Sequence, residues 1–136
     1  MIKTVLSIDD DDITQILNTI YLESFGFCEK ILMAENGIEA LDLFKKLENG
    51  EEPMAHFPEI IFLDLNMPIM DGWEFYEAFS NNFPDYINKT KIFILSSSIN
   101  PSDEERANHE TGIVSFLSKP LNDENLMKVK RLLVLD

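Results

Sequence analysis

The sequence has little cysteine, few basic residues and no long apolar run. Its one cysteine, Cys28, allows neither an internal disulfide nor a cysteine-rich metal site, so we interpret it as a reduced thiol. No window approaches the roughly 18–20 apolar residues of a membrane helix, and no basic-then-apolar segment near Met1 is typical of a secretory signal. These absences predict a soluble protein of the cytoplasm that does not associate with a membrane.

Basic residues are scarce relative to acidic ones. Lys and Arg number 11 against 25 Asp and Glu, a formal net charge of −14 with His neutral. Such a charge repels nucleic acid and anionic lipid, and it favours cations or basic protein surfaces as partners. The length of 136 residues suits one domain with a core of its own. We therefore expect a single domain, residues 1–136, that does not bind nucleic acid.

Hydrophobic patterns predict strands and helices that alternate along the chain. The expected strands are residues 3–8, 31–34, 60–63, 91–95 and 113–117. This alternation is typical of an α/β fold, a doubly wound five-stranded parallel sheet with five helices and right-handed crossovers.

Each of the five expected helices follows a strand. The first runs from Ile13 to about Ser24 and shows an apolar stripe at helical spacing, formed by Ile13, Ile16, Leu17, Ile20 and Tyr21. The others are indicated by a cap, a stripe or a breaker: Asn36 with Ala40, Leu41, Phe44 and Leu47; Phe75, Tyr76, Phe79 and Phe83 before Pro84; Asn100-Pro101; and Asn122 with Leu126, Val129 and Leu133. Because the fourth helix has little apolar face beyond Ala107, we expect it to be exposed and loosely held.

The segment from Pro58 to Gly72 is the centre of the chain. Its apolar run, residues 60–63, is typical of a strand covered on both faces. Asp64 follows directly, and Met67-Pro68 and Asp71-Gly72 then predict a loop. Ligands of open α/β sheets bind at the carboxyl ends of the strands, so Asp64 is a candidate chemical group. Taken alone, it also suits a simple turn cap.

Polar residues follow the other predicted strands in the same way. Asp9 to Asp12 follow the first strand, Ser96 to Ser98 the fourth, and Lys119-Pro120 the fifth. Each group has an ordinary structural explanation by itself, as a cap, a turn or a solvated lysine. A parallel sheet, however, brings all of these strand ends to one edge. Their joint placement favours a functional site.

The chemistry of this set favours a divalent cation and a phosphoryl group. Asp9, Asp10 and Asp64 would repel one another at close range, and at least one carboxyl pKa would rise unless a cation lay among them. Oxygen ligands with few protein contacts suit Mg²⁺. A carboxylate beside this metal, facing a hydroxyl and an ammonium group, can accept a phosphoryl group. Motifs of serine hydrolases, P-loop proteins and zinc proteases are absent, and His56 and His109 fit surface positions.

Five short motifs occur in order along the chain: I-D-D-D after the first strand, A-E-N-G-I-E-A-L at residues 34–41, L-D-L-N-M-P-I-M-D-G at 63–72, L-S-S at 95–97, and F-L-S-K-P at 116–120. In this order they resemble the receiver-domain family of two-component response regulators. The resemblance covers essentially the whole chain. It implies a flavodoxin-like sheet with strand order 2-1-3-4-5.

The resemblance also implies roles for individual residues. Asp64 would be the phosphoacceptor. Mg²⁺ would be held by Asp10 directly, by Asp9 through water, by Asp64, and by the backbone carbonyl of Asn66. Lys119 would contact the phosphoryl group, and the Lys119–Pro120 peptide bond would be cis.

The remaining implied roles concern signalling. Ser96 would be the switch hydroxyl and Phe116 the switch aromatic, which would act through packing alone. Asn66 and Ser98 would tune dephosphorylation. The implied phosphodonor is a sensor histidine kinase or phosphotransfer protein, and a downstream protein would bind the face of the fourth helix, fifth strand and fifth helix. We expect no output domain and no enzymatic activity, since the chain ends with the fifth helix.

Two other functions and one assembly are compatible with parts of the sequence. A pseudo-receiver would keep the fold and bind partners without phosphorylation, although such proteins usually lack an acid or the lysine. A phosphatase of the haloacid-dehalogenase type needs an acid two residues after its nucleophile, where this chain has Asn66. The apolar C-terminal residues 132–135 leave room for a homodimer.

Overall fold

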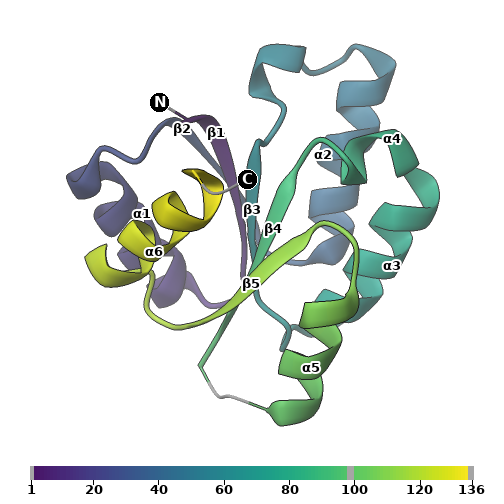
Figure 1. The fold of residues 1–136 in the computed structure, drawn as a ribbon. Coiled ribbons are helices and arrows are strands. Elements are labelled where there is room, and N and C mark those ends of the chain that lie inside the picture. The colour runs from purple at the N-terminus through teal and green to yellow at the C-terminus, as the bar shows by residue number, and fades with distance from the viewer. Residues whose placement is uncertain (1, 98–99, 135–136) are drawn as a thin grey trace.

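The computed structural model describes residues 2–97 and 100–134. Its centre is one parallel sheet of five strands in the order β2-β1-β3-β4-β5 (Figure 1). The strands are β1 Ile2–Ile8, β2 Cys28–Ala34, β3 Ile60–Leu63, β4 Lys91–Ser96 and β5 Ile113–Ser118. The fold class and the strand order are as expected, and β2 is longer than predicted.

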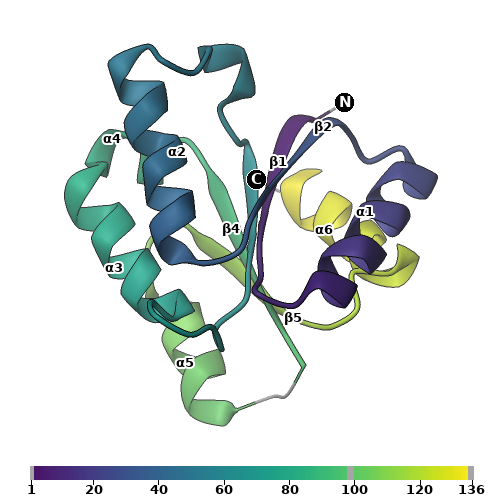
Figure 2. The same cartoon turned by 180° about the vertical axis from the view of Figure 1, so that it is seen from behind.

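Helices cover both faces of the sheet. They are α1 Asp12–Phe25, α2 Gly37–Asn49, α3 Gly72–Asn82, α4 Pro84–Ile87, α5 Pro101–His109 and α6 Asp123–Val134, with a 3₁₀ turn η1 at Met54–His56. Helices α1 and α6 lie on one face, and α2, α3, α4 and α5 lie on the other (Figures 1 and 2).

The expected number of five helices is wrong, because the described residues form six. Pro84 does end α3, as predicted. It also occupies the first turn of the short helix α4, where its fixed φ and missing N–H do no harm. The predicted fourth and fifth helices are consequently α5 and α6.

Side chains of the central strand alternate between two apolar cores. Ile61 and Leu63 point into the core under α2 and α3, whereas Ile60 and Phe62 point into the core under α1 and α6. All of β3 is buried, as the unbroken apolar run predicts. Complete burial of each of these side chains contributes about 1.5–3 kcal/mol.

Polar side chains begin several helices where the sequence indicates. The side-chain oxygen of Asn36 accepts a hydrogen bond from the backbone N–H of Glu39 at 2.9 Å, and that of Asn100 accepts one from Ser102 at 2.9 Å. Asn122 accepts one in the same way from Asn125 at 3.0 Å. These bonds satisfy backbone donors that have no partner within the helix.

Helix α1 exposes most of its predicted apolar stripe. Ile13, Ile16 and Ile20 of the predicted stripe are each more than half exposed. The side chains that α1 buries are Gln15, Asn18 and Leu22. The stripe therefore predicted the helix correctly, although most of its side chains do not face the core.

The predictions of a loosely held fourth helix and of an apolar C-terminus concern α5 and α6. Ala107 is the one buried residue in the described part of α5, yet this helix is held by polar contacts with α3 described below. Leu132 and Leu133 are partly buried against the core, and Leu135 lies outside the described residues.

None of the described helices has the length and apolar character needed to cross a bilayer.

Candidate functional site

The predicted site residues lie where the strands end. Backbone hydrogen bonds continue the ladders just past these ends: the N–H of Asp9 donates to Ala34, that of Asp64 to Ile8 at 3.0 Å, and that of Lys119 to Ser96 at 2.8 Å. Each site residue is thereby fixed by the neighbouring strand. The sheet edge brings together side chains from distant parts of the chain, as the strand order requires.

Three carboxylates converge at this edge. Asp9, Asp10 and Asp64 each place an oxygen within 4.8 Å of the oxygens of the other two. Asp9 and Asp64 are buried, and Asp10 is exposed. Two anionic side chains fixed by buried backbone therefore face a third at the surface, which leaves an approach from solvent.

Lys119 is the cation that faces these acids. Its Nζ lies 2.7 Å from an oxygen of Asp9 and 3.4 Å from an oxygen of Asp64. Burial lowers the pKa of Lys119, but the hydrogen bond to Asp9 and the negative charges of Asp64 and Asp9 outweigh it, so the pKa is raised. Lys119 therefore stays protonated at neutral pH.

The carboxyl group of Asp64 has a raised pKa. Burial, and next the charge of Asp9, raise its pKa to about 6, although Lys119 and the N–H of Asn66 act in the opposite direction. One ammonium group thus does not compensate three carboxylates. A divalent cation among the three would, and hard carboxylate oxygens that leave positions for water are ligands that Mg²⁺ accepts. The residues present fit a magnesium site.

Gln15 supports the acidic turn and was not predicted. Its buried side-chain amide donates toward the backbone carbonyls of Ser7, Asp9 and Ala34 at 3.0–3.2 Å. It thereby fixes the turn between β1 and α1 that carries Asp9. A polar residue three positions into a predicted helix, beside an apolar stripe, was the available signal, but the sequence does not show that its face is buried.

The loop after Asp64 is held tightly against α3. The backbone N–H of Gly72 donates to Leu65 at 3.0 Å. A side chain at Gly72 would begin only 2.6 Å from the carbonyl oxygen of Asp64. The absence of a Cβ at this glycine therefore allows the first turn of α3 to pack directly on the backbone of Asp64.

The remaining predicted residues lie around this centre. Ser96 is buried at the end of β4, Asn66 is exposed with its N–H 3.4 Å from Asp64, and Phe116 is partly buried against the core under α2 and α3. The Lys119–Pro120 peptide bond is cis, as expected. Ser98, predicted to tune dephosphorylation, lies outside the described residues.

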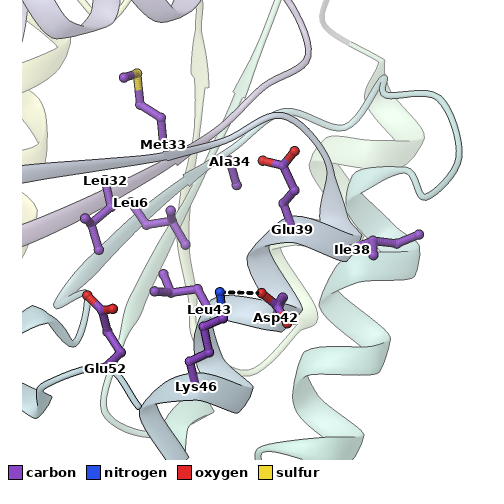
Figure 3. Close-up of a pocket in the computed structure, with 10 residues that line it drawn as sticks. All are labelled: Leu6, Leu32, Met33, Ala34, Ile38, Glu39, Asp42, Leu43, Lys46 and Glu52. Atoms are coloured by element: carbon purple, nitrogen blue, oxygen red, sulfur yellow. Dashed lines mark ion pairs between the residues drawn. The ribbon is translucent and has the colours of Figure 1, made fainter.

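A separate hollow of about 480 Å³ lies between β2 and α2 (Figure 3). Its floor is formed by leucines such as Leu32 and Leu43, with acids at the rim. Its one cation, Lys46, is 3.1 Å from Asp42 and is paired with it. None of the predicted site residues lines this hollow, so it is distinct from the acidic site.

Comparison with known proteins agrees with this fold. Residues 5–131 match the response regulator receiver domain. A protein-glutamate methylesterase/protein-glutamine glutaminase from Methanococcoides burtonii is 31% identical over 134 residues, which cover 98% of this chain and 34% of that protein. The chain thus spans about a third of this relative.

Solved structures show the same likeness. A two-component response regulator from Cytophaga hutchinsonii superposes with a TM-score of 0.88 at 32% identity, over 99% of this chain and 98% of that one. The receiver domain of the histidine kinase CKI1 from Arabidopsis thaliana, solved with Mg²⁺ and BeF₃⁻, gives 0.78 at 26% identity, over 97% and 90%. Fold and site define a signalling module of two-component systems. The chain belongs to the response regulator receiver domain family.

Proposed function

We propose that this protein accepts a phosphoryl group on Asp64 from a phosphohistidine of a sensor histidine kinase or phosphotransfer protein, in a Mg²⁺-dependent reaction. The observation that carries this proposal is the convergence of the Asp9, Asp10 and Asp64 carboxylates within 4.8 Å, beside the Lys119 ammonium group. A structural neighbour solved with Mg²⁺ and BeF₃⁻, the CKI1 receiver, supports the assignment of metal and ligand.

The transfer requires a nucleophile and compensation of charge. An oxygen of Asp64 attacks phosphorus, the phosphorus–nitrogen bond breaks, and its electron pair returns to the imidazole of the donor. Asp9, Asp10, Asp64 and the carbonyl of Asn66 would hold Mg²⁺, which supplies positive charge beside the phosphoryl oxygens. Lys119 would supply a second positive charge beside Asp64 and keep the anionic product bound.

The phosphorylated state would be read through a change in protein binding. The Ser96 hydroxyl donates to a phosphoryl oxygen, and Phe116 repacks into the space that this movement leaves. The face of α5, β5 and α6 then binds a downstream protein. Asn66 and Ser98 are the residues that we expect to tune the hydrolysis of the phosphoryl group. In this proposal the chain acts in the cytoplasm as a single receiver domain, by binding rather than by enzymatic turnover.

The exposed stripe of α1 is the surface we assign to the phosphodonor. Ile13, Ile16 and Ile20 project from the helix that begins directly after Asp10 and Asp11. A partner seated on this stripe is therefore next to the acidic site, and exposed apolar patches of this kind are typical of protein interfaces. Its neighbours Asp12 and Glu23 favour a partner with basic residues around an apolar centre.

Labelling with a small phosphodonor tests the proposed chemistry. Acetyl phosphate with Mg²⁺ should add one phosphoryl group to the intact protein, detected by mass spectrometry. The variant Asp64→Asn should remain unlabelled, and removal of Mg²⁺ should abolish labelling of the wild type. A wild-type protein that stays unlabelled and does not bind beryllofluoride would instead be a pseudo-receiver. Repeated turnover of a phosphoester would indicate a phosphatase.

A further inference from the structure

The helix α5 is attached to α3 by one cluster of polar and aromatic contacts. We propose that Trp73 and Glu77 of α3, together with Asp103 and Arg106 of α5, form a latch that holds α5 in its resting position and opens when Asp64 is phosphorylated. This inference rests on the proposed function. We call these four residues the α3–α5 latch.

Three contacts make up the latch, and each joins a different pair of groups. The indole N–H of Trp73 donates to a carboxylate oxygen of Asp103 at 3.0 Å. The guanidinium carbon of Arg106 lies 4.2 Å from the centre of the Trp73 ring. Arg106 also donates to Glu77 at 2.8 Å. The indole is thus held at its edge by an anion and on its face by a cation, and both come from α5.

The first turns of α5 bury little side-chain surface in the structure. Ala107 is its one buried side chain in the structure, and an alanine buries little apolar surface. Beyond the other end of α5, the hydroxyl of Tyr76 donates to the carbonyl of Thr111 at 2.6 Å. The position of the first turns of α5 therefore depends on the latch. Figures 1 and 2 both show α5 beside α3.

The two halves of the latch belong to elements that begin next to different residues of the phosphorylation site. Trp73 directly follows Gly72, whose backbone packs against the carbonyl of Asp64. Asp103 lies in the first turn of α5, and Ser96 is the last residue of β4, the element that precedes α5 in the chain. When a phosphoryl group on Asp64 draws Ser96 closer, the end of β4 moves, and α5, which follows β4 in the chain, shifts relative to α3, which stays with Asp64. The indole hydrogen bond is directional, so such a shift breaks it.

The latch must then oppose activation. An interaction made only in the resting state lowers the population of the active state and weakens every ligand that binds the active state. Removal of the latch should therefore strengthen the binding of beryllofluoride, which stands in for the phosphoryl group on Asp64. Loss of one such hydrogen bond predicts an affinity gain of about fivefold.

Beryllofluoride titration in the presence of Mg²⁺ tests this directly. The variants are Asp103→Ala, which removes the indole acceptor, and Arg106→Gln, which removes the cation. The matched controls are Asp42→Ala and Lys46→Gln, which break an exposed ion pair of α2 away from the site. Isothermal titration calorimetry should give a dissociation constant about fivefold lower for each latch variant and an unchanged value for each control.

Trp73, the single tryptophan of the chain, provides a second readout. Saturating beryllofluoride should shift the emission of the wild type toward that of a solvated indole, and Asp103→Ala should show part of this shift without ligand. If circular dichroism shows that Asp103→Ala does not fold, Arg106→Lys replaces it in the titration. This variant keeps the charge but lacks the planar group that stacks on Trp73, so we expect a smaller gain in beryllofluoride affinity.

The outcomes separate the latch from the proposed function. The latch alone would be overturned if its variants bound beryllofluoride no more tightly than the wild type. It would also be overturned if the emission of Trp73 did not change when the ligand bound. A wild-type protein that binds no beryllofluoride in Mg²⁺ would overturn the proposed function and the latch together.

Discussion

Ionisation of the Asp64 carboxyl group lowers the free energy of unfolding of the protein. Its side chain is only 5% exposed, and burial together with the charge of Asp9 raises its pKa from 3.8 to about 6. A raised carboxyl pKa means that the folded state binds this proton more tightly than the unfolded state. The free energy of unfolding contributed by Asp64 is therefore greatest below pH 3.8 and falls as the pH rises to about 6.

Asp64→Asn should accordingly stabilise the metal-free protein. The asparagine keeps the shape of the side chain and removes the buried charge, while Lys119 loses one of its two anionic partners. We expect a net gain of about 1–2 kcal/mol above pH 6, measured by urea unfolding in a chelator. The gain should shrink toward zero near pH 4, because the wild-type carboxyl is then protonated. A gain that does not depend on pH would contradict the raised pKa.

Ile69 is a strained residue in the loop that follows Asp64. It is the one non-glycine residue with positive φ among the described residues, at 71°, and its side chain is 78% exposed. A β-branched side chain in the left-handed region is strained, and here almost no burial compensates it. The sequence pattern predicted a loop at this point but contains no signal for the sign of φ.

Ile69→Asn should raise the free energy of unfolding by about 0.5–1 kcal/mol, since asparagine tolerates the left-handed conformation. Ile38→Asn is a suitable control, because Ile38 is also an exposed isoleucine but lies in the regular helix α2. The control should be neutral or slightly destabilised in the same urea titration. Equal effects at both positions would show that exposure, rather than backbone strain, is the cause.

At the scale of elements, the sequence predicted helix α1 but not its orientation. Helical spacing shows which side chains share a face, and it does not show whether that face meets the sheet or the solvent. Gln15 decides the matter, since its amide reaches three backbone carbonyls of the site only if its own face is buried. The meeting of the site residues was predictable, because the carboxyl ends of all strands in a parallel sheet lie at the same edge. The orientation of α1 was not predictable, because two of the three side chains that it buries, Gln15 and Asn18, are polar.

The α1 stripe should matter for a protein phosphodonor and not for a small one. Ile16 is 59% exposed, and isoleucine and serine have similar helix propensities, so Ile16→Ser should change stability by less than about 0.5 kcal/mol. Labelling by acetyl phosphate should stay unchanged. Phosphotransfer from a cognate histidine kinase, identified by profiling the kinases of the host, should slow about tenfold. Equal rates for both donors would place the docking surface elsewhere.

At the scale of the whole molecule, the negative net charge and the acidic site both favour the binding of cations. The chain carries a net charge of −14, and three of its carboxylates meet within 4.8 Å at the sheet edge. Both features attract cations, one diffusely and one at a point. Monovalent salt screens the diffuse field but cannot bridge three carboxylates, whereas Mg²⁺ can do both.

Stabilisation by Mg²⁺ at constant ionic strength separates the two contributions. A cation that binds only the folded state adds about 2.7 kcal/mol when its concentration is 100 times its dissociation constant. We therefore expect Mg²⁺ to raise the thermal midpoint of the wild type above that in NaCl of equal ionic strength. Asp10→Asn should abolish this difference, because it removes the exposed carboxylate of the cluster and hardly changes the net charge. If Mg²⁺ stabilised Asp10→Asn as much as the wild type, the effect would arise from the general field of the protein, and the three acids would not form a specific site.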